Sequence, residues 1–217
     1  MISGNFVAEV DSAFLYVMYV SIALMIGVTA TMLYFVFRYH HTRNEKGTDI
    51  HGNVMLEVIW TVGPTLLVMT MFWAGYSGYN HMESIPDDAM EVEVTARMWG
   101  WNFTYPNGAT SDTMYVPVDQ PIDCKMESVD VLHSFYIPEF RVKKDCVPDG
   151  KNRMWFTAPA AGQYQVFCTE YCGLDHAYMY TAVVAMERAE FDAWYNANAK
   201  ADESTAAIEI PETNESM

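Results

Sequence analysis

Two long stretches without charged residues dominate the first part of the chain. No Asp, Glu, Lys or Arg occurs between Asp11 and Arg38, and none occurs between Glu57 and Glu83. Each stretch exceeds the roughly 20 residues that an α-helix needs to cross a bilayer. We therefore predict a hairpin of two transmembrane helices. Its parts are an exterior segment at 1–12, helices at about 13–38 and 57–80, and a connecting loop at 39–56.

The distribution of basic residues predicts how this hairpin is oriented. Arg38, Arg43 and Lys46 are the only Lys or Arg residues before position 97, and they cluster at the connecting loop. The positive-inside rule places this loop in the cytoplasm or matrix and both chain ends outside. The leading segment carries Glu9 and Asp11 and a second span follows, so we do not expect a cleaved signal peptide. We expect the bacterial inner membrane rather than the mitochondrial one.

After a linker at 81–90 the hydrophobic period changes from helical to two. Residues 91–98 alternate between polar and apolar, and the aromatic run 99–105 continues the alternation up to a turn at Pro106. Further short apolar segments are separated by Pro, Gly and Asp, which is typical of a β-sandwich or barrel. We expect an exported all-β domain at 91–186, a helix at 187–200 and a flexible acidic tail at 201–217.

The exported part is strongly acidic. From residue 81 onward nine Lys or Arg stand against 23 Asp or Glu. Such a surface repels nucleic acid and can steer a basic protein partner at low salt. The alternative is that the charge serves only solubility.

Soft metal ligands are concentrated in one late run. Cys168, Cys172, His176 and Met179 supply thiolate, imidazole and thioether, a set that suits copper. A blue-copper site needs one cysteine, so the second thiolate suggests a dinuclear site. His133, from an earlier segment, would complete it. The alternatives are a Cys168–Cys172 disulfide and core packing of His133 and Met179.

The run from Cys168 to Met179 resembles the CuA signature of the cytochrome c oxidase subunit II family. Other segments resemble that family's upstream ligand segment (Asp130–Pro138), its tryptophan-rich region (Trp99–Tyr105) and the start of its second membrane helix (Leu56–Pro64). The resemblance implies a cupredoxin-like Greek-key domain outside the membrane. Departures from the family pattern include Cys146 in place of a small residue and Asp149 in place of glycine.

The resemblance also implies a ligand set. The sulfurs of Cys168 and Cys172 would bridge two coppers, and His133 and His176 would each bind one of them. Met179 and the backbone carbonyl of Glu170 would be weak outer ligands. The Glu170 side chain would be free to bind a magnesium ion shared with subunit I.

Two further residues acquire roles from the resemblance. Trp99 would receive electrons from cytochrome c, with core or interface packing as the alternative. Glu57 would lie at the mouth of a proton path in subunit I, with a plain interfacial carboxylate as the alternative.

The function implied is the electron-accepting subunit of a membrane haem–copper oxidase. Electrons would pass from cytochrome c to haem in subunit I, where oxygen is reduced to water with proton translocation. This chain shows no acid–base pair or activated nucleophile, so the catalytic centre would lie on the partner. The alternatives are the CuA subunit of a nitric oxide reductase and a membrane-anchored cupredoxin carrier or copper chaperone.

Two cysteines remain outside the copper run. Cys124 and Cys146 form a pair in an exported domain, so we predict a disulfide between them. Two buried free thiols are the alternative.

Overall fold

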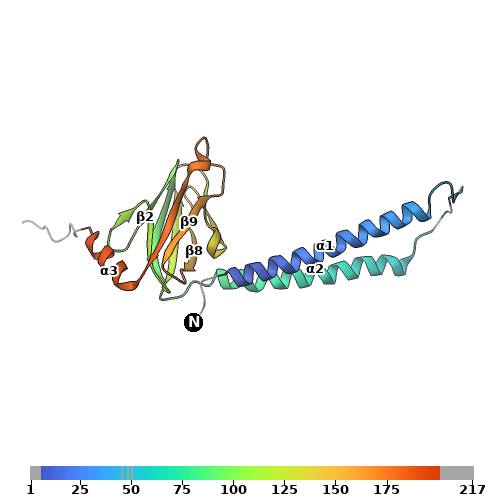
Figure 1. The fold of residues 1–217 in the computed structure, drawn as a ribbon, viewed down its shortest axis with the longest axis horizontal. Coiled ribbons are helices and arrows are strands. Elements are labelled where there is room, and N and C mark those ends of the chain that lie inside the picture. Colours follow the sequence, from blue (N-terminus) through green and yellow to red (C-terminus); the bar gives the residue numbers. More distant parts are fainter. Residues whose placement is uncertain (1–5, 45, 48, 50, 201–217) are drawn as a thin grey trace, which may run out of the picture.

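A long helical hairpin projects from one end of a β-domain (Figure 1). The computed structural model describes residues 6–44, 46, 47, 49 and 51–200, so the predicted tail at 201–217 and residues 1–5 of the predicted exterior segment lie outside the described residues. The hairpin consists of α1 (Val7–Arg38) and α2 (Val54–Met82). Two apolar helices followed by this β-domain confirm the predicted fold class.

Both helices begin earlier than the sequence pattern predicted. α1 takes in Glu9 and Asp11, whose carboxylates lie near the positive end of the helix dipole. α2 begins after Asn53, whose side chain accepts a hydrogen bond from the Leu56 N–H at 3.2 Å. Polar residues at a helix start therefore act as caps and first-turn charges, which hydropathy alone does not detect.

The apolar surface of the hairpin is not covered by the chain itself. Neither helix contains a buried residue. The two helices are joined by a hydrogen bond between Tyr16 Oη and Thr70 Oγ1 of 2.6 Å. Their exposed apolar side chains are left for lipid or for a partner protein, as expected of membrane-spanning helices.

The β-domain consists of two five-stranded sheets. The strand order is β3-β2-β1-β5-β8 in one sheet and β4-β10-β9-β6-β7 in the other. Strand β1 pairs parallel with β5, and β10 pairs parallel with β4, while the remaining pairs are antiparallel. The strands are β1 (Met90–Arg97), β2 (Gly100–Thr104), β3 (Thr110–Ser111), β4 (Met114–Pro117), β5 (Pro121–Ser128), β6 (His133–Ile137), β7 (Val142–Cys146), β8 (Asn152–Thr157), β9 (Gly162–Cys168) and β10 (Tyr180–Met186).

Alternating side chains fill the space between the sheets. Val92 and Val94 of β1 are fully buried, as the alternation in residues 91–98 predicted. From the opposite sheet, Phe135 packs edge-on against Trp101 and Phe103, with ring centroids 5.1 and 6.0 Å away. These aromatic contacts fix strand β6, whose first residue is a predicted metal ligand.

A short helix, α3 (Arg188–Ala197), covers the side of the domain next to β4. Its Phe191 is buried, and its Trp194 ring lies 4.6 Å from that of Tyr115 and 5.0 Å from that of Tyr105. The Tyr105 hydroxyl donates to the Tyr115 carbonyl at 2.9 Å. Helix α3 is thus part of the domain core rather than an appendage.

The predicted disulfide between Cys124 and Cys146 is not formed in the structure, in which both cysteines are free and buried. Cys124 lies in β5 of one sheet and Cys146 in β7 of the other. Burial raises the pKa of Cys146 to about 12 and that of Cys124 well above its ordinary value. In this state both side chains serve as small core residues.

Asp149 occupies a position where the backbone favours glycine. Its φ is 56°, in the left-handed region that most side chains avoid. Aspartate tolerates this region better than most residues because its short polar side chain can hydrogen-bond locally. Glycine would adopt this conformation without strain.

The free state of Cys124 and Cys146 is open to a direct test. Alkylation of the denatured, unreduced chain, followed by peptide mass spectrometry, should label both residues, because neither thiol readily forms a thiolate in the folded state. A linked peptide pair containing both residues would contradict the structure.

Candidate metal centre

The ligand-rich run is a loop closed by the two strands that flank it. Cys168 is the last residue of β9, and the loop returns to β10 through a short 3₁₀ helix, His176–Tyr178. The Cys168 N–H donates to the Met179 carbonyl at 3.0 Å, and the Thr169 N–H donates to the Ser134 carbonyl at 3.1 Å. These bonds bring the two ends of the loop together and attach it to β6.

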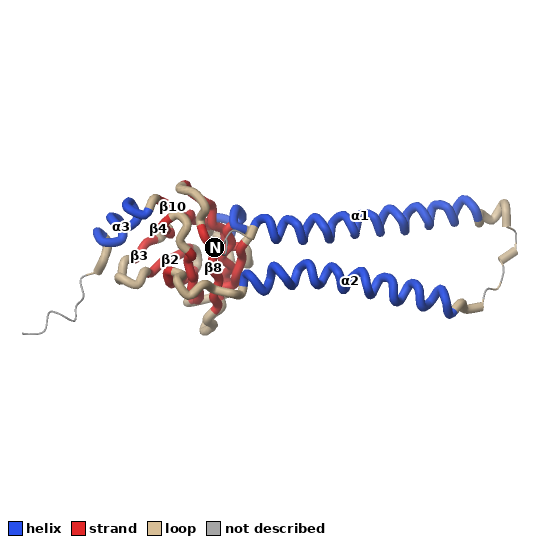
Figure 2. The backbone as a smooth tube through the Cα atoms, turned by 90° about the horizontal axis from the view of Figure 1, so that it is seen from below, coloured by secondary structure: helices blue, strands red, loops and turns tan. Residues whose placement is uncertain are grey.

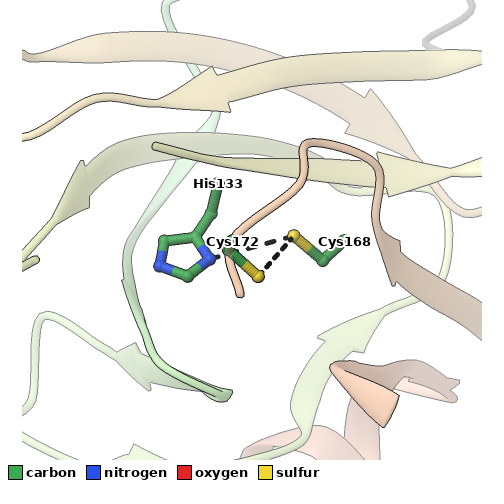
Figure 3. A group of neighbouring side chains, drawn as sticks. All are labelled: His133, Cys168 and Cys172. Carbon is green, nitrogen blue, oxygen red and sulfur yellow. Dashed lines mark hydrogen bonds between the residues drawn. The ribbon is translucent and has the colours of Figure 1, made fainter. Parts of the chain in front are cut away.

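Three side chains meet where the loop contacts β6 (Figure 3). The ligand atoms of His133, Cys168 and Cys172 all lie within 4.8 Å of one another. Cys168 Sγ is 3.8 Å from His133 Nδ1 and 3.8 Å from Cys172 Sγ. Two sulfurs facing each other beside an imidazole are the arrangement that a sulfur-bridged metal site requires.

The remaining predicted ligands surround the same two sulfurs. His176 Nδ1 lies 3.5 Å and Met179 Sδ 3.7 Å from Cys172 Sγ. The backbone oxygen of Glu170 lies 3.3 Å from Cys168 Sγ. The fold thus brings together all six residues that the sequence singled out around copper.

Burial controls the charge state of the Cys172 sulfur. Cys168 is 7% exposed and Cys172 is 4% exposed. Burial, reinforced by the neighbouring Cys168, raises the pKa of Cys172 to about 12. A metal cation would reverse this preference by stabilising the thiolate, so metal uptake should release protons. The combination of buried thiolate, imidazole and thioether fits copper better than the hard cations.

Asp130 is a functional residue that the ligand pattern did not identify. Its Oδ1 lies 2.8 Å from His133 Nε2, while its Oδ2 accepts from the Met98 N–H at 2.7 Å. Burial alone would raise the pKa of Asp130, but hydrogen bonds from Met98, His133 and Val131 outweigh it and lower this pKa to about 2.

The ionised Asp130 determines the tautomer of His133. A carboxylate can only accept, so Nε2 carries the proton and Nδ1 presents its lone pair toward the sulfurs. A carboxylate behind a metal-binding histidine orients the ring and raises its basicity. The only sequence signal for this role is the position of Asp130 three residues before His133.

Trp99 contacts the loop directly. Its Nε1–H donates to the Cys172 carbonyl at 3.2 Å, while the residue remains 38% exposed. Gly173, with φ of +117°, lies against this ring, and a Cβ there would approach the Trp99 ring to 3.3 Å. Glycine at 173 therefore permits the close contact between an exposed indole and a ligand-bearing backbone.

Glu57 and the side chain of Glu170 are not part of this cluster. Glu57 lies in the first turn of α2, at the end of the hairpin remote from the β-domain (Figure 1). The half-buried Glu170 carboxylate has no hydrogen bond or ion pair within the described residues.

Asp130→Asn should weaken copper retention by about 10–100-fold, the usual cost of losing a group that orients a ligand. The amide keeps the size of the side chain but cannot hold the Nε2–H tautomer as a carboxylate does. Competition with a copper chelator would measure the effect. Glu127→Asn, an acid-to-amide change on the outer face of β5, is the control. Equal retention in both variants would contradict the role of Asp130.

Comparison with known proteins places this fold and this site in one family. The family model "Cytochrome C oxidase subunit II, periplasmic domain" matches residues 71–186, and the model of the transmembrane domain matches residues 3–77. Cytochrome c oxidase subunit 2 of Synechocystis is 29% identical, over 96% of this chain and 78% of the relative. The alternative cytochrome c oxidase subunit 2 of Bradyrhizobium diazoefficiens is 30% identical, over 77% of this chain and 72% of the relative.

A solved structure agrees with the sequence matches. The periplasmic domain of subunit II of cytochrome oxidase from Bradyrhizobium japonicum is 29% identical and superposes with a TM-score of 0.51, over 53% of this chain and 96% of that one. The match to a periplasmic domain covers the part of the chain that carries the cysteine–histidine cluster. This chain is a membrane protein of the cytochrome c oxidase subunit II family.

Proposed function

We propose that this chain is the electron-accepting subunit of a haem–copper oxidase and that it holds a dinuclear copper centre. The observation that carries the proposal is the pair of buried sulfurs, Cys168 and Cys172, 3.8 Å apart with an imidazole nitrogen beside each. When bound there, two coppers would supply one-electron redox chemistry in which the charge is shared across both metals.

The chain's own residues make such a site rigid. Ligands come from the start of β6 and from a loop closed by backbone hydrogen bonds. Residues held on strands and locked by packing move little when charge changes, which favours electron transfer. Met179 and the Glu170 carbonyl would complete the site as weak outer ligands.

Trp99 is the proposed point at which electrons enter. Its exposed edge is accessible to a donor, and its indole N–H donates to the backbone carbonyl of Cys172. Exposed apolar side chains occur on the adjoining residues Met98, Val129 and Val131. An apolar centre within an acidic domain suits a basic donor such as cytochrome c, because charge steers the encounter and apolar contact fixes the docked pose.

The partner proposed to bind the membrane hairpin is the haem-bearing subunit I. The α1–α2 hairpin offers unburied apolar helices to it, and the unpaired Glu170 carboxylate is available for a magnesium ion shared between the subunits. Glu57, at the far end of α2, is proposed to lie at the mouth of a proton path in subunit I. This arrangement puts the β-domain on the periplasmic side of a bacterial inner membrane.

Turnover of the purified complex separates the oxidase from a nitric oxide reductase. Copurification in mild detergent should yield a polytopic haem-bearing partner, and the complex should consume oxygen with reduced cytochrome c as donor. A complex that reduces only nitric oxide would show that nitric oxide, and not oxygen, is the terminal acceptor. A chain that purifies with no haem partner would support a free cupredoxin carrier or chaperone.

Trp99→Phe should slow electron transfer from cytochrome c more than it alters copper content. The phenyl ring fills much of the space but loses the N–H bond to the Cys172 carbonyl. Rapid-mixing absorbance with reduced cytochrome c measures the rate, and metal analysis measures the copper. Met98→Leu, an exposed neighbour without this bond, is the matched control. Loss of copper in Trp99→Phe would assign Trp99 a structural role instead.

A further inference from the structure

The membrane hairpin is packed against the β-domain by an aromatic cluster. Phe6, directly before α1, is 0% exposed, and its ring lies 5.2 Å from that of His81 and 5.1 Å from that of Trp155, edge to face in both cases. His81 is in the last turn of α2 and also pairs with Glu9 at 2.9 Å. Trp155 is in β8 of the β-domain, from one end of which both helices project (Figure 2). One ring from each of three separate segments therefore closes the junction.

Apolar contacts extend this junction on both sides. Val10 of α1, Met82 of α2 and Ile85 of the linker all pack against the core of the β-domain. A short linker between two units ordinarily permits relative motion unless the interface is apolar. Here both helix ends and the linker are attached to the domain, so its orientation on the hairpin is set by packing.

Two ion pairs cross the same junction. Arg141 Nε lies 3.0 Å from Asp11 Oδ1 of α1, and Lys144 Nζ lies 2.8 Å from Glu83 Oε1 at the end of α2. Exposed pairs of this kind contribute little to stability. They do define orientation, because each helix end is matched to a different position on the domain.

These contacts use part of a basic segment in an otherwise acidic domain. Of the nine Lys or Arg residues from position 81 onward, five lie from 141 to 153, and Arg141 and Lys144 are the two that pair with the hairpin. Carboxylates at the ends of both helices face this basic segment. The acidic surface elsewhere is left available for a basic donor.

We propose that this junction, formed by Phe6, His81, Trp155 and the Asp11–Arg141 and Glu83–Lys144 pairs, positions the metal cluster relative to the membrane. The inference rests on the proposed function, in which electrons leave the cluster for a haem on the partner that binds the hairpin. Phe6 and Arg141 are positioning residues: they touch neither metal ligand nor donor, and they act by fixing the distance and angle across which the electron is delivered.

A charge swap in the assembled oxidase complex tests the junction. Arg141→Asp should slow electron transfer from the copper centre to the partner's haem several-fold, measured by flash photoreduction, with copper content and the copper EPR spectrum unchanged. Asp11→Arg alone should do the same, and Asp11→Arg with Arg141→Asp should restore the rate. Unchanged rates in both single variants, or no recovery in the double variant, would overturn the proposal.

The control is an ion pair of similar exposure that does not cross the junction. Lys125 Nζ lies 2.7 Å from Glu91 Oε2 within the β-domain, and Lys125→Glu changes the net charge by the same amount as Arg141→Asp. This variant should leave the internal transfer rate unchanged. Equal slowing in Lys125→Glu would attribute the effect to charge rather than to position, and would overturn the proposal.

A second measurement covers the case in which a variant fails to assemble with its partner. Hydrogen exchange of the metal-loaded full chain in detergent should become faster across residues 83–89 and β8 in Phe6→Ala, and much less so in Phe6→Leu. Unchanged protection of these residues against hydrogen exchange in Phe6→Ala would overturn the proposal. Absence of a copper signal in the unmodified chain would instead refute the proposed function, so the two failures are distinguishable.

Discussion

The site depends on the closure of a single loop. The hydrogen bond from the Cys168 N–H to the Met179 carbonyl joins the residue before the loop to the residue that ends it. A second bond, from the Thr169 N–H to the Ser134 carbonyl, attaches the loop to the strand that begins with His133. Strands β6 and β9 also pair directly, with Phe135 opposite Cys168. Strand pairing and loop closure together therefore bring into one pocket ligands that are separated by 35 residues of sequence.

Burial then makes this pocket selective. The two thiols are almost completely excluded from water, and burial raises the pKa of Cys172 to about 12. The site favours thiolates only when a cation is present, so soft metal binding and deprotonation are coupled. Asp130 orients the second kind of ligand. Its hydrogen bond to Nε2 of His133 leaves the Nδ1 atom of that ring facing the same pocket.

The sequence predicted the parts of the molecule that follow from local pattern. Uncharged stretches located both helices, alternation located strand β1, and the spacing of Cys168, Cys172, His176 and Met179 located the cluster of candidate metal ligands. Family membership is established by the comparisons, while the individual ligand roles remain predictions. The disulfide predicted between Cys124 and Cys146 is absent from the structure, which has both residues as buried free thiols in strands of different sheets.

What the sequence could not predict comes from contacts between distant segments. Asp130 behind His133, Trp99 on the Cys172 carbonyl and Phe6 beside Trp155 each depend on how strands and helix ends meet in space. No periodicity or spacing encodes such meetings. The five basic residues between 141 and 153 were visible in the sequence, but only the fold shows that two of them face carboxylates at the ends of the hairpin.

The central claim is that Cys168 and Cys172 hold two coppers that share one electron. Copper analysis combined with EPR spectroscopy of the intact chain in detergent tests it most directly. The account predicts two coppers for each chain and a hyperfine pattern in which one unpaired electron is delocalised over both metals. One copper for each chain, with the spectrum of a blue-copper protein, would contradict it.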